Sequence, residues 1–194
     1  MKNQINLVLI SIILSCGTST GDNTDIVNEK KNPEIMEENR NNTDDSIIIQ
    51  EKKDFLTGRY DPKLHPEFDV LDNIYHTKPE MYLHKGTINA FIKMRTQAQK
   101  DGISLIIVSG TRNFYSQKSI WERKYTQNKK NGLTNRENIR KIMLWSSMPS
   151  TSRHHWGTDI DINGFDTYFN GTNEKANKEY EWLRNNAHKF GFCQ

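Results

Sequence analysis

The segment over residues 152–161 (SRHHWGTDID) constrains the fold more than any other part of the sequence. It places His154 and Asp161 seven residues apart, whereas neighbouring side chains on one helix lie three or four residues apart. The spacing favours a turn at Gly157 that leads into a strand over residues 158–162. Such a turn can bring an imidazole and a carboxylate together, and this pair is a usual ligand set for catalytic zinc. The alternative is a polar turn before an edge strand.

Two further motifs accompany this segment, over residues 109–121 (SGTRNFYSQKSIW) and 181–192 (EWLRNNAHKFGF). The three motifs, in this order, resemble those of the D-alanyl-D-alanine carboxypeptidase and dipeptidase family of zinc peptidases, including its VanY-like members. The resemblance covers approximately residues 55–194. It implies a hedgehog/DD-peptidase fold, a Zn²⁺ cofactor, and hydrolysis of a peptide bond next to a D-amino acid of peptidoglycan.

The metal site that the resemblance implies has two ligands in this sequence. His154 and Asp161 match the family's first two zinc ligands. His155 is then not a ligand, and we expect it to be exposed or to contact the ligands only indirectly. Asp159 stands where the family often has alanine. Its carboxylate could attract the cation or face solvent, and we expect it to face solvent. Zinc held in this way would lower the pKa of a bound water toward neutral.

The resemblance also implies a substrate-binding set. Arg112 and Gln117 match family positions near the substrate, and Ser152 matches a serine that hydrogen bonds to the substrate carboxylate. A guanidinium suits the terminal carboxylate of a D-alanine, or the oxyanion that develops at the scissile carbonyl. Without the motif, Arg112 would be read as a residue at a helix start that pairs with a surface acid.

Family members continue past the Phe-Gly-Phe segment into strands that carry a glutamate base and a histidine as third zinc ligand. The sequence ends at Gln194, so we expect weak metal retention and weak or absent activity. Glu174, Glu179 and Glu181 are not assumed to replace the base, because each lies before or within the last predicted helix. A truncated gene or fragment, a pseudoenzyme, and a ligand from another chain remain open explanations.

Three functions agree with these features. The first is a zinc metallopeptidase that trims peptidoglycan stem peptides ending in D-alanine, with D,D and L,D specificity both open. The second is a catalytically inactive lipoprotein that binds wall peptides. The third is a hedgehog-like signalling or adhesion module, because the same architecture can serve without hydrolysis.

The N-terminus is typical of an exported protein. Lys2 precedes an apolar run over residues 5–14 (INLVLISIIL), which is too short to span a bilayer and fits the core of a signal peptide. Residues 13–17 (ILSCG) resemble the bacterial lipoprotein cleavage box, which predicts removal of residues 1–15 and lipidation of Cys16. The protein is then a membrane-anchored lipoprotein of the cell envelope or periplasm. An ordinary secretory leader with an incidental cysteine is the alternative.

Charge divides the rest of the sequence in two. Residues 17–54 carry ten acidic and five basic residues with few aromatics, so residues 16–54 are predicted to form a disordered polar tether. Residues 55–194, the predicted peptidase-like domain, carry 21 basic and 14 acidic residues. This positive balance suits an anionic polymer. The basic residues are scattered, so nucleic acid is not expected as a partner.

Hydrophobic periodicity predicts an α+β domain in which helices pack on a small, mostly antiparallel sheet that lacks its last strands. The expected elements are four helices, over residues 82–100, 114–128, 136–144 and 174–190, and strands over residues 103–108 and 158–162.

Overall fold

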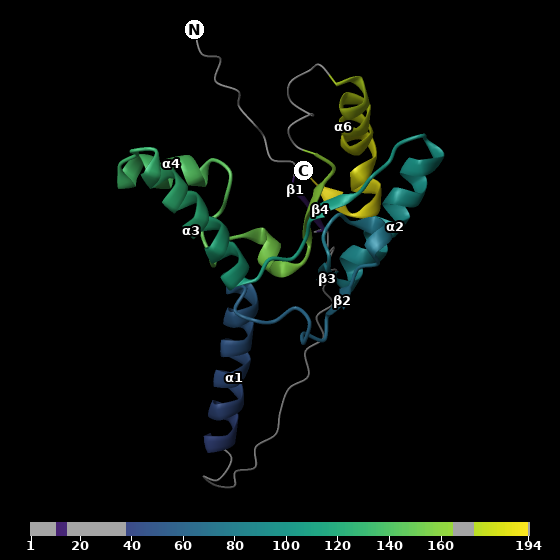
Figure 1. Cartoon of the computed structure of the whole chain (residues 1–194). Coiled ribbons are helices and arrows are strands. Elements are labelled where there is room, and N and C mark those ends of the chain that lie inside the picture. Colours follow the sequence, from purple (N-terminus) through teal and green to yellow (C-terminus); the bar gives the residue numbers. More distant parts are fainter. Residues whose placement is uncertain (1–10, 15–37, 165–172, 194) are drawn as a thin grey trace, which may run out of the picture.

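The computed structural model describes residues 11–14, 38–164 and 173–193. Its helices are α1 (Glu38–Thr57), α2 (Lys85–Lys100), α3 (Phe114–Lys130), α4 (Asn135–Met143) and α6 (Glu174–Asn186), with 3-10 turns η1 (Asn73–Tyr75), η2 (Arg153–Trp156) and η3 (Ala187–Phe190) (Figure 1). Its strands are β1 (Ser11–Leu14), β2 (Phe68–Val70), β3 (Tyr82–His84), β4 (Ile107–Ser109), β5 (Asp159–Ile162) and β6 (Phe192–Cys193).

The strands form two antiparallel sheets. The larger has the order β4-β5-β1-β6, and β2 pairs with β3 in the smaller. In the larger sheet Ser109 of β4 lies opposite Asp161 of β5, which brings the end of β4 to the predicted metal ligands. The predicted α+β class is confirmed.

The central partner of β5 and β6 is a segment of the predicted leader. Ser11 of β1 lies opposite Asp161, and Leu14 lies opposite Phe192. An apolar run can fill this position because both neighbouring strands offer unpaired backbone donors and acceptors. The predicted lipidation site, Cys16, lies outside the described residues.

The hydrophobic core lies between the larger sheet, α2 and the C-terminal helix. Apolar residues of α2 recur at helical spacing and are fully buried, among them Phe91, Met94 and Ala98. They pack with Ile107, Ile160, Leu183 and Phe192, among other buried residues. This core fixes the positions of β4 and β5 and therefore of the residues that follow or precede them.

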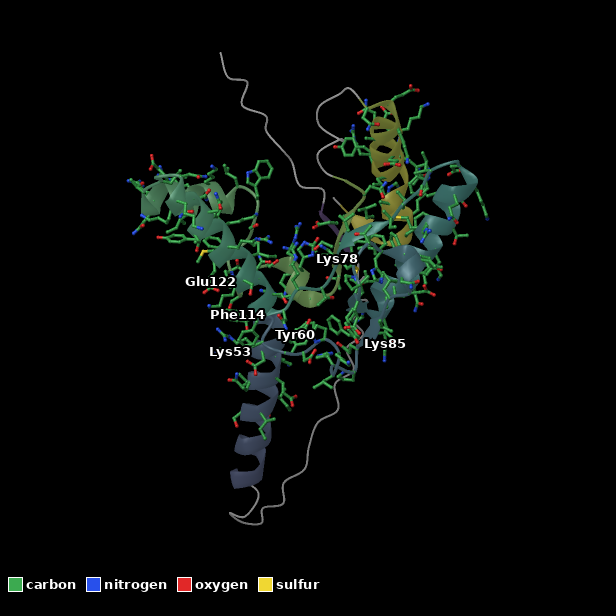
Figure 2. The ribbon with its side chains drawn as sticks, viewed as in Figure 1. Lys53, Tyr60, Lys78, Lys85, Phe114 and Glu122 are labelled. Atoms are coloured by element: carbon green, nitrogen blue, oxygen red, sulfur yellow. The ribbon has the colours of Figure 1, made fainter. Side chains whose placement is uncertain are left out.

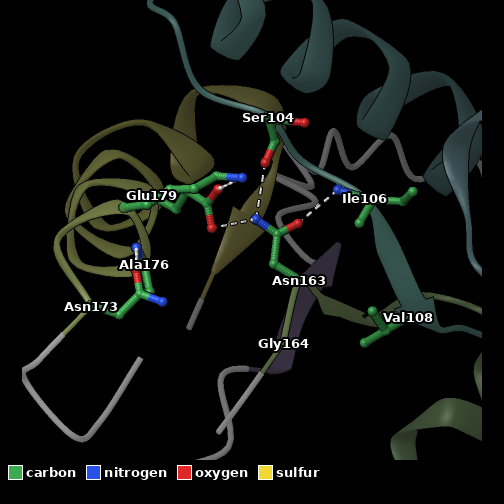
Figure 3. Close-up of a pocket in the computed structure, with 9 residues that line it drawn as sticks. Ser104, Ile106, Val108, Asn163, Gly164, Asn173, Ala176 and Glu179 are labelled. Carbon is green, nitrogen blue, oxygen red and sulfur yellow. Dashed lines mark hydrogen bonds and ion pairs between the residues drawn. The ribbon is translucent and has the colours of Figure 1, made fainter. Parts of the chain in front are cut away.

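The strand predicted over residues 103–108 is shorter than expected, because β4 begins only at Ile107. The side chain of Asn163 bonds to the preceding backbone instead: its Oδ1 accepts from Ile106 N at 2.8 Å, and its Nδ2 donates to Ser104 O at 2.9 Å and to Glu179 at 2.8 Å. Figure 3 shows these bonds in a pocket beside α6. Asn163 has φ 55°, a left-handed conformation that asparagine tolerates better than most residues.

The disordered tether predicted over residues 16–54 is wrong for residues 38–54, which form most of α1. Its last turns contain Gln50, Glu51, Lys52 and Lys53, residue types that favour helices, and Gln50 donates to Asp54 one turn later. Residues 15–37 lie outside the described part of the chain. None of the helices that the structure describes is long and apolar enough to cross a membrane.

The residues that follow α1 contact the start of α3. Phe114 N donates to Gly58 O at 2.7 Å, and the Arg59 guanidinium lies 3.8 Å from the centre of the Phe114 ring. Tyr60 and Phe114 mark this junction in Figure 2, with Lys53 on the last turns of α1. The α3–α4 hairpin and the β4–β5 sheet rise from the junction on separate sides (Figure 1).

Candidate metal and substrate site

The turn that presents the predicted ligands depends on a glycine. Gly157 ends η2 with φ 68°, a left-handed conformation. A Cβ at this position would lie 2.2 Å from Cε1 of Phe68 and 2.9 Å from the backbone nitrogen of His84. Glycine therefore supplies both the backbone conformation and the space, and the chain enters β5 two residues later.

His154 and Asp161 lie side by side in the structure. His154 Nε2 is 3.5 Å from Asp161 Oδ2, and both side chains are buried. The other ring nitrogen, His154 Nδ1, bonds to the carbonyl of Asp159 at 3.0 Å. Because a carbonyl only accepts, Nδ1 carries the proton when the ring is neutral, and the lone pair of Nε2 is left facing the carboxylates.

Asp159 differs from expectation. It was predicted to face solvent, but it is 2% exposed, and its Oδ2 lies 3.7 Å from His154 Nε2 and 3.7 Å from Arg153 Nε. The period of two along β5 explains this position, since Asp159 and Asp161 share one face of the strand. Burial raises the pKa of the Asp159 carboxyl, while His154 and Arg153 act to lower it.

The guanidinium of Arg112 contacts Asp161 and Gln117. Its Nη2 is 3.4 Å from Asp161 Oδ2, and its Nη1 donates to Gln117 Oε1 at 3.1 Å. Gln117 is fully buried and donates in turn to the carbonyl of Ser147 at 2.6 Å. Burial lowers the pKa of the Arg112 guanidinium, and Asp161 and Asp159 act to raise it.

All five residues that the sequence predicted as metal ligands or substrate-binding residues line one pocket of about 610 Å³. Arg112, Gln117, Ser152, His154 and Asp161 line it, with Ile120, Arg123, Lys124, Trp145, Ser146, Ser147, Thr151, Arg153 and Asp159. Apart from Gln117 and Ser152, the sequence analysis did not find the lining residues from α3 and from the segment after α4. Their contribution depends on how the α3–α4 hairpin folds over β5, and no local motif indicates that.

Of the two environments expected for His155, exposed or in indirect contact with the ligands, the structure excludes the exposed one. His155 is fully buried, its Nδ1 donates to Arg112 O at 2.5 Å, and its Nε2 accepts from Ser150 N at 3.1 Å. Burial lowers the pKa of this imidazole. Both ring nitrogens are occupied by backbone groups, so neither lone pair can reach a metal ion. The side chain instead fixes the loops that carry Arg112 and His154.

His154 and Asp161 fit two of the four coordination positions of one zinc ion. Tetrahedral ligands about 2.0–2.2 Å from zinc lie about 3.3–3.5 Å apart, which agrees with the 3.5 Å between His154 Nε2 and Asp161 Oδ2. The Oδ1 atoms of Asp159 and Asp161 are buried without a hydrogen-bond partner. A cation bound beside them would supply the missing partner. Among the residues that the structure describes, no group of three or more histidines, cysteines or acids is arranged to hold a metal ion.

Comparison with known proteins decides the family. A family model described as VanY, D-alanyl-D-alanine carboxypeptidase, matches residues 80–194, more than half of the chain. The chain belongs to this family. The resemblance inferred from the three motifs is therefore confirmed, and the matched region contains the whole pocket described above.

Two relatives with curated descriptions match parts of the chain. A D-alanyl-D-alanine carboxypeptidase of Enterococcus faecalis V583 is 33% identical over 97 residues, which is 50% of this chain and 34% of that protein. The carboxypeptidase-like protein YodJ of Bacillus subtilis 168 is 27% identical over 157 residues, which is 78% of this chain and 52% of YodJ. The chain thus spans between a third and about half of the length of these relatives.

A solved structure with the same fold carries a ligand. VanYB in complex with D-alanine-D-alanine superimposes with a TM-score of 0.51 and 26% identity, over 67% of this chain and 68% of that one. The D-alanine-D-alanine in that complex belongs to VanYB.

Proposed function

We propose that this protein is a zinc-dependent D-alanyl-D-alanine carboxypeptidase that trims peptidoglycan stem peptides. The observation that carries the proposal is the single pocket in which His154 and Asp161 meet Arg112, Gln117 and Ser152. The family membership and the D-alanine-D-alanine bound to VanYB support the same substrate class.

The proposed roles follow from the contacts of each side chain. His154 and Asp161 would hold the zinc ion, which when bound activates a water and polarises the scissile carbonyl. Arg112, placed between Gln117 and Asp161, would bind the terminal carboxylate of the peptide or the developing oxyanion. Ser152, which also lines the pocket, would donate a hydrogen bond to the same carboxylate.

Hydrolysis at this site also needs a general base. No glutamate is among the described residues that line the pocket, and Glu179 instead bonds to Asn163 in the pocket beside α6. We propose that turnover at this pocket is slow, because general-base catalysis typically contributes on the order of a hundredfold to ten-thousandfold in rate.

The anchoring of the protein is a separate proposal that rests on the sequence. We infer that residues 1–15 are removed and that Cys16 carries lipid. Removal would also take away Ser11–Leu14, and with it the strand between β5 and β6. Mass spectrometry of the protein purified from its own membranes should find lipidated Cys16 at the N-terminus. A different N-terminus, or an unmodified Cys16, would exclude the anchor.

Stereochemistry tests the proposed activity. We expect the zinc-loaded protein to release the terminal residue from a pentapeptide ending in D-Ala-D-Ala, and not from the same peptide ending in L-Ala-L-Ala. A version with an amidated C-terminus should be a poor substrate, because Arg112 and Ser152 would lose the carboxylate that they bind. Equal release from all three peptides would contradict the proposal.

A further inference from the structure

A second pocket adjoins the first, between α3 and α4. It has a volume of about 410 Å³ and is lined by Arg123, Lys124, Gln127, Asn128, Lys141, Ile142 and Trp145. Three of these residues, Arg123, Lys124 and Trp145, also line the pocket that contains His154 and Asp161. The two pockets therefore adjoin one another along these three residues.

The second pocket is built on a fixed hairpin. Asn128 of α3 donates to Asn138 of α4 at 2.9 Å, and Asn138 donates to the carbonyl of Tyr125 at 2.8 Å. Ile142 is 1% exposed and contributes apolar surface, and the half-buried indole of Trp145 adds to it. A side chain bound here would meet an apolar surface that already has a defined shape.

The charged residues that line this pocket are all basic. None of the ion pairs formed within the described ranges includes Arg123, Lys124 or Lys141. Lys124 Nζ donates only to a neutral partner, Ser146 Oγ, at 2.6 Å. Burial lowers the pKa of the Lys124 ammonium, and the charges of Arg112 and Arg123 lower it further, so these cations lie close enough to repel one another. An anion bound among them would relieve that repulsion.

We propose that the pocket between α3 and α4 is a specificity subsite that binds a carboxylate of the peptide substrate, on a residue that precedes the scissile bond. Arg123 and Lys141 pair with that carboxylate, and the indole of Trp145 contacts the aliphatic part of the same residue. This inference rests on the proposed function. The terminal carboxylate must bind at Arg112 if the preceding residues of the peptide are to reach the pocket between α3 and α4.

Calorimetric titration of the zinc-loaded protein with matched peptides tests the inference. The probes are acetylated pentapeptides that end in D-Ala-D-Ala and carry one glutamate, or one glutamine in its place, at each of the first three positions. Binding is measured for the wild type, for Arg123→Gln and Lys141→Gln, and for Lys130→Gln. The last variant removes an equal charge from α3 at a residue that lines neither pocket.

We expect the glutamate peptide to bind about threefold to tenfold more tightly than its glutamine partner at one of the three positions. Arg123→Gln and Lys141→Gln should each remove at least half of that preference, and Lys130→Gln should keep it. High salt should reduce the preference in the wild type. The glutamine peptides should bind the wild type, Lys141→Gln and Lys130→Gln about equally.

Two results would overturn the subsite. One is the lack of any glutamate preference at all three positions, and the other is a preference that both pocket variants retain. Release of D-alanine from the glutamine peptides separates this failure from failure of the proposed function. If those peptides are bound and cleaved, only the subsite is wrong. If none of the peptides is bound or cleaved, the carboxypeptidase proposal fails and the subsite fails with it.

Discussion

At the scale of single residues, two adjacent histidines have opposite environments. His154 directs one ring nitrogen at Asp161, whereas both ring nitrogens of His155 are engaged by backbone groups. The sequence indicated which histidine faces the carboxylate, because the family's motif has its histidine three residues before the glycine, which here is Gly157. The sequence left open whether His155 is exposed, since its partner Arg112 lies 43 residues away.

Substitution of the two histidines should affect zinc affinity and stability differently. His154→Ala and Asp161→Ala should lower zinc affinity by more than the roughly tenfold to hundredfold loss that follows removal of a group that only supports a ligand. His155→Ala should retain bound zinc but lower the free energy of unfolding by about 2–4 kcal/mol, because it leaves buried backbone groups unpaired. Isothermal titration and urea unfolding measure the two effects. Loss of zinc in His155→Ala with an unchanged His154→Ala would reverse the assignment.

The stability of the metal-free protein should depend on the protonation of His155. Burial lowers the pKa of this histidine below its ordinary 6.5, so the unfolded chain takes up a proton at a higher pH than the folded one. The contribution of the neutral ring is thus present above pH 6.5 and is lost as the pH falls through the lowered pKa. His155→Gln lacks this titration.

Urea unfolding with chelator at pH 7.5 and pH 5.0 measures this effect. The free energy of unfolding of the wild type should fall more between the two pH values than that of His155→Gln. Equal losses in both proteins would show that His155 does not contribute to the acid sensitivity.

At the scale of elements, helices followed from the sequence more closely than strands did. The predicted helix over residues 114–128 is present as Phe114–Lys130, because its boundaries depend on local caps such as Asn113, whose side chain accepts from Ser116 N. The strand predicted over residues 103–108 begins late, because the side chain of Asn163 replaces strand bonds from 57 residues away. Such a distant partner has no local signal.

The turn before β5 should be intolerant of any side chain. Gly157→Ala places a Cβ against Phe68 and the backbone of His84, whereas a Cβ added at Gly132, which has a similar positive φ, would meet no atom within 4 Å. Gly132→Ala should therefore cost only about 1 kcal/mol for the left-handed conformation. Gly157→Ala should cost roughly 1–3 kcal/mol more from overpacking. Chemical unfolding of both variants measures the difference, and equal costs would show that Phe68 moves aside freely.

At the scale of the whole molecule, the site joins segments that the sequence keeps apart. Arg112 follows β4, Gln117 lies on α3, and His154 and Asp161 flank the turn into β5. The motifs predicted these residues, since each motif is local. The basic wall from Arg123, Lys124 and Lys141 was not predicted, because it forms only when the α3–α4 hairpin packs beside the sheet.

The initial rate of D-alanine release from a pentapeptide ending in D-Ala-D-Ala tests the central claim most directly. The measurement compares the wild type and Asp161→Asn, each with zinc and with chelator, and uses Lys130→Gln as a surface control. The account predicts slow release by the wild type and by Lys130→Gln that requires zinc, and release at the uncatalysed rate by Asp161→Asn. Equal rates for the wild type and Asp161→Asn in the presence of zinc would contradict the account.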